Sequence, residues 1–212
     1  MPIWQGRAQG CSASRWKSWG AWLLISIGRW TCNLAEQARL EALIRTVDTR
    51  ELFYAARSLA TVLAERALHA LRLLEDTPLP EGCCIHRKQS SFSVQIHTER
   101  GLRLQHCLDE QTLAAVVDPC SYATSQALGR EMRQLGIQAF EVPSARVPQE
   151  APCVGVLTPY AFVSTPFDFQ DWTLEVRADG VTFASFGQSQ VVSLPREQFL
   201  VAGRWPGPEP KA

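Results

Sequence analysis

Apolar residues recur at helical spacing in three segments of the chain, residues 34–46, 58–74 and 122–135. The stripe along the second segment consists of Leu59, Leu63, Ala67, Leu71 and Leu74. Such a stripe is typical of a helix with one buried face. Ser58 is a residue type that caps helix N-termini, and Gly136 is a type that ends helices. The pattern therefore predicts three helices over these ranges.

Other segments follow the spacing of strands. Phe92, Val94 and Ile96 alternate with polar residues, as in a half-buried strand. The alternation resumes after residues 99–101, so we expect a hairpin with its turn there. Shorter apolar runs predict further strands at residues 52–54, 138–142, 154–157, 172–177 and 181–186. Helices interspersed with strands, of which one pair is antiparallel, predict an α/β (α+β) fold with a mixed, partly antiparallel sheet flanked by helices.

The N-terminal region contains one apolar run, WGAWLLISI at residues 19–27. It is too short to cross a bilayer, and no small-residue cleavage site follows it. It fits a buried strand, a buried helix or a leader. We expect three parts: an N-terminal segment at 1–33 whose fold the sequence leaves open, one main domain at 34–190, and a tail at 191–212 that is partly disordered.

Acidic and basic residues balance, with 21 of each among 212 residues. The chain therefore lacks the basic character typical of nucleic-acid-binding proteins. Its seven cysteines form no C-x-x-C pair, and its four histidines have no metal-ligand spacing, so we expect no metal. Scattered cysteines of this kind are typical of reduced thiols in the cytoplasm. We expect a cytoplasmic protein that binds neither nucleic acid nor a membrane.

The sequence contains no glycine-rich phosphate-binding motif, nucleophile elbow or zinc-protease motif. One group of residues nevertheless suggests a site. Tyr54 ends a predicted strand, and Glu65 and His69 follow on a predicted helix, four residues apart and so on one face. Glu65 lies at the edge of the buried stripe, where a carboxylate can be partly desolvated beside a cleft. The alternative, which spacing alone favours, is a solvated Glu65 paired with Arg66 or Arg72.

A second candidate is the Pro-Ser-Ala-Arg loop at residues 143–146, between two predicted strands. The hydroxyl of Ser144, the backbone N–H groups and the guanidinium of Arg146 are the kinds of group that bind phosphate. The alternative is an ordinary connecting turn.

Taken in order, three segments carry a resemblance to a known family. They read LFYAARSLATVLAERALH, DPCSYATSQALGREMRQLGIQAFEVPSARVP and PYAF. Tyr54 and Glu65 stand eleven residues apart, and Ser144 lies in the PSAR loop. This arrangement resembles the RES-domain family, most of whose members are toxins of bacterial toxin–antitoxin pairs.

The resemblance implies a fold similar to that of the ADP-ribosyltransferases and an activity that breaks the nicotinamide–ribose bond of NAD. Phosphate or water would be the acceptor, NAD the substrate, and an Xre-type antitoxin the protein partner. It further implies that Glu65 stabilises the oxocarbenium-like ribose, Tyr54 contacts that ribose and Ser144 binds the nucleotide or acceptor. An arginine would hold the pyrophosphate. The chain could also associate with copies of itself.

The arginine is where the sequence departs from the family. The family carries a glycine-arginine-aromatic element about ten residues before the tyrosine. Here Arg45 and Arg50 stand in that window without the glycine or the aromatic neighbour, and together with Arg146 they are our candidate NAD-binding arginines. The departure leaves open the alternative of a catalytically inactive RES-like binding protein. The implied similarity of fold leaves open a further alternative, a protein ADP-ribosyltransferase.

Overall fold

The computed structural model describes residues 14–25, 52–75, 80–147, 149, 151–185 and 187–206. The helix expected over 34–46 lies outside the described residues, as do Arg45, Arg50 and the chain beyond residue 206. The apolar run near the N-terminus falls largely within a strand, so the strand is the correct choice among the alternatives that its sequence left open.

The described strands form one sheet of eight strands in the order β1-β2-β5-β4-β3-β6-β7-β8. Their bounds are β1 Ser14–Ile25, β2 Phe53–Ala56, β3 Ile85–Arg103, β4 Ala139–Val142, β5 Cys153–Val156, β6 Phe167–Arg177, β7 Gly180–Ser185 and β8 Gln190–Pro195. The pair β3–β4 is parallel and the other described pairs are antiparallel. Because β1 also pairs with β3, the first five strands of that order form a closed ladder. The expected mixed sheet is confirmed.

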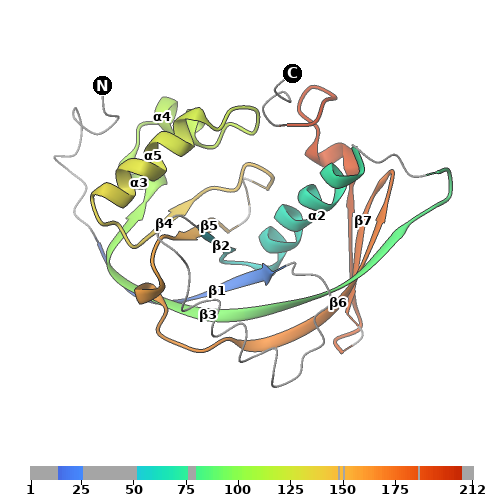
Figure 1. The fold of residues 1–212 in the computed structure, drawn as a ribbon, viewed down its shortest axis with the longest axis horizontal. Helices are drawn as coiled ribbons and strands as arrows, with labels where there is room; N and C mark the ends of the chain where they lie inside the picture. The colour runs from blue at the N-terminus through green and yellow to red at the C-terminus, as the bar shows by residue number, and fades with distance from the viewer. Residues whose placement is uncertain are drawn as a thin grey trace.

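The helices lie on the concave side of this curved sheet and at one of its ends (Figure 1). They are α2 Leu59–Glu75, α3 Leu104–Cys107, α4 Glu110–Val116, α5 Ala123–Gln134 and the 3₁₀ turns η1 Pro159–Ala161 and η2 Arg196–Phe199. Two predicted helices, now α2 and α5, are confirmed. Ser58 caps α2 by accepting a hydrogen bond from the Thr61 amide at 3.2 Å, and Gly136 takes φ +67° after α5. Among the described helices, none combines the length and apolar character that crossing a membrane requires.

The expected hairpin at residues 99–101 is wrong, because β3 continues as one strand to Arg103. Residues 85–93 of β3 pair with β6, residues 90–101 with β1 and residues 101–103 with β4. Each part of the strand therefore finds backbone partners from a different region of the chain. Pairing with distant segments overrides the local turn signal.

Three clusters of buried apolar side chains form the core of the protein. The first lies along β3, where Phe92, Val94 and Ile96 are buried. The second joins α2 to β6 and β7 through Leu68, Trp172 and their neighbours. The third joins α5 to β4 and β5.

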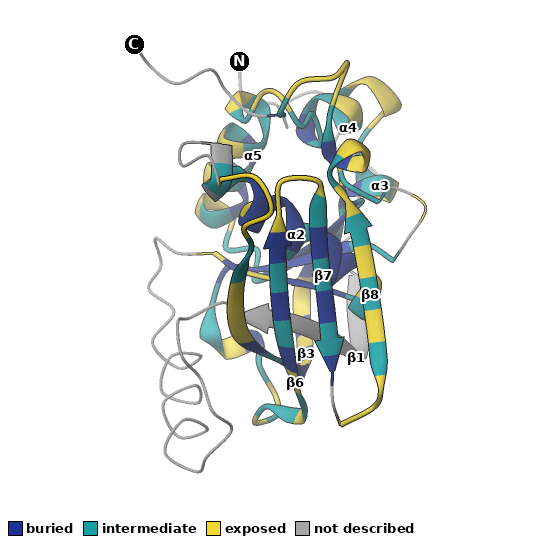
Figure 2. Cartoon of the chain, turned by 90° about the vertical axis from the view of Figure 1, so that its right-hand side faces the viewer, coloured by how far each residue is buried: buried dark blue, intermediate teal, exposed yellow. Residues whose placement is uncertain are grey.

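Burial declines from β6 and β7 to β8 at the edge of the sheet (Figure 2). Residues beyond 190 also contribute to the core, because Phe199 of η2 joins the second cluster.

Among the described cysteines, one differs from expectation. Cys83, Cys84, Cys120 and Cys153 are free thiols, but Cys107 is disulfide-bonded. The expectation that all the thiols are reduced is therefore wrong for Cys107. Chain segments distant in sequence can bring cysteines together, which spacing alone does not reveal.

Candidate active site

The three predicted catalytic residues, Tyr54, Glu65 and Ser144, lie close to one another on β2, on α2 and just after β4. Strand β2 carries Tyr54 and leads directly into α2, which presents Glu65 after two turns. Ser144 follows the end of β4. Segments far apart in the sequence thus meet at one point.

The hydroxyl of Ser144 is the centre of a small hydrogen-bond network. It donates to Oε1 of Glu65 at 2.7 Å and accepts from the amides of Arg146 and Val147 at 3.1 and 3.3 Å. Ser144 is 1% exposed. Because its one proton and its lone pairs are engaged, the geometry favours a role in holding Glu65 over direct contact with a ligand.

Cys153 is a member of the site that the sequence did not suggest. Its Sγ donates to the same Oε1 of Glu65 at 3.6 Å. The register explains its place: Cys153 is opposite Ala56 of β2, two residues from Tyr54, so that both side chains lie on one face of the sheet. A thiol at the start of an apolar strand was the only local signal in the sequence.

The thiol of Cys153 is protonated at neutral pH. Burial, assisted by the negative charge of Glu65, raises the pKa of Cys153 from 9.0 to about 12. The thiol therefore remains a hydrogen-bond donor to Glu65 throughout the physiological range.

We expect Cys153 to resist alkylation in the native protein. Raising its pKa from 9.0 to about 12 lowers its thiolate fraction at pH 8 about a thousandfold, and the side chain is buried. The exposed Cys83 and Cys120 are internal controls. Peptide mass spectrometry after a timed iodoacetamide pulse should find these two labelled and Cys153 labelled only after denaturation. Labelling of native Cys153 at the rate of Cys120 would contradict this environment.

Tyr54 has one exposed side and one enclosed side. The residue is 40% exposed, yet burial, followed by the negative charge of Glu65, raises the pKa of its hydroxyl well above the ordinary value. Its hydroxyl also interacts with Cys153. Tyr54 therefore stays neutral and can both donate and accept a hydrogen bond at the edge of the site.

Two cavities open at this point, and Tyr54 and Glu65 line both. The larger has a volume of about 440 Å³, within the usual range for a small-molecule site. Its apolar walls include Val116, Met132, Phe140, Val142 and Leu157. The smaller, of about 170 Å³, is lined by residues of β2 and α2 that include His69.

Gly155 shapes the wall of the larger cavity. It lies between Tyr54 on β2 and Phe140 on β4 in the strand register. A Cβ atom at this position would overlap the ring of Phe140. The missing side chain therefore lets the Phe140 ring lie over the strand, where it lines the cavity.

Arg146 supplies positive charge to the larger cavity. It lines the wall and is half-buried, and its positive charge acts on Tyr54 by lowering the tyrosine pKa, against the larger opposing effects. Within the described part of the chain, its buried Nε has no hydrogen-bond partner. Arg133 lines the same cavity and donates to the Leu157 carbonyl at 3.4 Å. The other two predicted arginines lie outside the described residues.

His69 faces the smaller cavity, on the same helix face as Glu65, as the spacing predicted. Desolvation lowers its pKa, with further lowering by nearby arginines and an opposing effect of Glu65. The imidazole is therefore neutral at pH 7 and can accept or donate one hydrogen bond.

The hydrogen bonds around Glu65 can hold its carboxylate in a fixed orientation toward a bound ligand. Among the described residues, the hydrogen bonds to Glu65 reach only Oε1. Two donors on one oxygen fix the orientation of the carboxyl group and leave Oε2 to face another partner. A fixed negative charge beside a cavity with an arginine on its wall suits a substrate that is anionic at one end and develops positive charge at the other.

The comparisons with known proteins agree with the resemblance seen in the sequence. A family model described as the RES domain matches residues 4–177, most of the chain and every residue of this site. No curated protein matches the sequence.

Proposed function

Because this chain belongs to the RES-domain family, we propose that it consumes NAD by cleaving the bond between nicotinamide and ribose. The observation that carries the proposal is the Ser144–Glu65 hydrogen bond of 2.7 Å beside Tyr54, on the wall of a cavity that also holds Arg146. Family membership supports a toxin-like or NAD-related role, and this geometry supports the narrower reaction.

The residues that line the larger cavity suit NAD as the substrate. A pyrophosphate needs a cation, and the guanidinium of Arg146 can bind its oxygens in a bidentate manner. The nicotinamide and ribose would lie beside Tyr54, whose ring offers an apolar face and whose hydroxyl stays neutral. The apolar walls would exclude water from the bond that breaks.

Glu65 would act on the transition state. As the carbon–nitrogen bond breaks, its electron pair leaves with the nicotinamide, and the ribose carbon becomes positively charged until an oxygen of phosphate or water bonds to it. A carboxylate held by Ser144 and Cys153 stabilises that charge without having to reorganise. Cys153 and Ser144 are positioning residues in this account.

The biological role that we propose is the one typical of the family. We propose that the protein acts as the toxin of a toxin–antitoxin pair in the cytoplasm and that an Xre-type antitoxin neutralises it. NAD destruction would require no metal at this site, because the proposed charge stabilisation comes from Glu65 and Arg146.

The test is to incubate the purified protein with NAD, with and without phosphate, and to follow nicotinamide release by chromatography. We expect release, with ADP-ribose or its phosphate ester as the second product according to the acceptor. Thermal stabilisation by NAD without turnover would instead favour an inactive binding protein. Transfer of label from NAD to a protein would favour an ADP-ribosyltransferase.

A further inference from the structure

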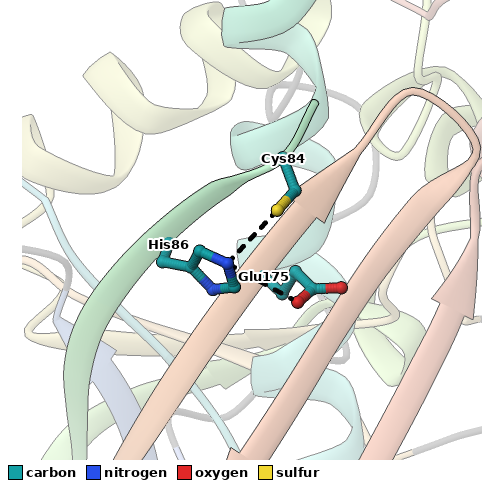
Figure 3. Close-up of side chains that lie close together, drawn as sticks. All are labelled: Cys84, His86 and Glu175. Carbon is teal, nitrogen blue, oxygen red and sulfur yellow. Dashed lines mark hydrogen bonds and ion pairs between the residues drawn. The ribbon is translucent and has the colours of Figure 1, made fainter. Parts of the chain in front are cut away.

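Cys84, His86 and Glu175 converge outside the candidate active site, at the start of β3 (Figure 3). Cys84 immediately precedes β3 and is two residues from His86, so in extended chain both side chains lie on one face. Glu175 of β6 is the cross-strand partner of His86. None of the three lines either cavity near Glu65.

The donor atoms of these side chains lie close enough together to share one tetrahedral metal ion. The Cys84 Sγ atom lies 3.2 Å from Nε2 of His86, and that nitrogen lies 3.7 Å from Oε2 of Glu175. The three donor atoms all lie within 4.8 Å of one another. Zinc bonds of about 2.3 Å to sulfur and about 2.0–2.2 Å to nitrogen and oxygen give donor separations of roughly 3.4–3.6 Å. Small side-chain adjustments would close the remaining differences.

A neighbouring arginine also orients the Glu175 carboxylate for binding a metal ion. Arg177 donates from Nε to Oε1 of Glu175 at 2.5 Å, while Oε2 faces His86. A second group that binds the far oxygen of a metal-bound carboxylate is a regular feature of metal sites. The three side chains are half-buried or exposed, so an ion can reach them and a water can complete its coordination.

We propose that Cys84, His86 and Glu175 bind a divalent cation of the zinc class. A thiolate, an imidazole and a carboxylate form a ligand set that suits zinc or cobalt better than magnesium or calcium. The bound ion would tie the start of β3 to β6. The sequence predicts no metal, because the histidines lack ligand spacing. In the proposed site the third ligand, Glu175, comes from a strand distant in the chain.

The test is an anaerobic titration of the chelator-treated protein with Co(II), its Cys107 disulfide left intact, followed by the thiolate-to-cobalt charge-transfer absorption. We expect one equivalent to produce the band in the wild type and in the matched control Cys83→Ser, whose exposed neighbouring thiol is outside the cluster. Cys84→Ser should lose the band. His86→Ala and Glu175→Gln should weaken binding at least about tenfold.

No band in the wild type, or an equal band in Cys84→Ser, would overturn the proposal. Loss of the band in Cys83→Ser but not in Cys84→Ser would do the same. Circular dichroism checks that each variant is folded. If Cys84→Ser is not, Glu175→Gln decides, because unchanged cobalt affinity in that variant would also contradict the site.

Discussion

Glu65→Gln is expected to lower kcat for nicotinamide release by about 10²–10⁴-fold. The substitution keeps the shape of the side chain and an oxygen that can still accept from Ser144 and Cys153. It removes the negative charge that would stabilise the positively charged ribose. Because the fold has no reason to change, the loss should appear in the rate of turnover and not in the melting temperature. Initial rates at saturating NAD and a thermal melt measure the two separately.

Glu81→Gln is the matched control, because Glu81 is exposed in the turn before β3 and does not line either cavity. It should keep the wild-type rate. If Glu65→Gln retained more than about a tenth of the wild-type kcat, the carboxylate would not be the group that acts on the transition state.

Ser144→Ala should cost both activity and stability. The amides of Arg146 and Val147 lose their acceptor and Glu65 loses its nearest donor. Leaving such buried groups unpaired costs about 1–3 kcal/mol in the free energy of unfolding. A carboxylate that is no longer held in one orientation should lower kcat about 10- to 100-fold. KM for NAD should change little, because Ser144 does not line the cavity. Denaturant melts measure the free energy of unfolding, and steady-state kinetics measure kcat and KM.

Ser164→Ala is the control, because the Ser164 hydroxyl accepts a single backbone hydrogen bond, from Gln95 at 2.9 Å, and lies outside both cavities. We expect at most about 1.5 kcal/mol of destabilisation and no change in kcat. A Ser144→Ala variant that is destabilised but fully active would show that the hydrogen bond serves the fold alone. A large rise in KM instead would point to direct contact between Ser144 and NAD.

The sequence by itself determined the elements whose side-chain period is unbroken over many residues. The stripe on α2 and the alternation around Val94 predicted a helix and a strand correctly, because burial of one face enforces each period. The ordered spacing of Tyr54, Glu65 and Ser144 also indicated the family, since it depends only on the order of residues along the chain.

Tertiary structure decided everything that depends on partners distant in the chain. The turn signal at residues 99–101 failed because β3 gains its hydrogen bonds from three other strands. Cys153 joins Glu65 only because β5 lies beside β2, and Glu175 joins His86 only because β6 lies beside β3. Sequence periodicity records which face of an element is buried, but the pairing of strands fixes which side chains meet there. Tyr54, Glu65 and Ser144 could therefore be proposed from the sequence, whereas Cys153 and the hydrogen bonds that hold Glu65 could not.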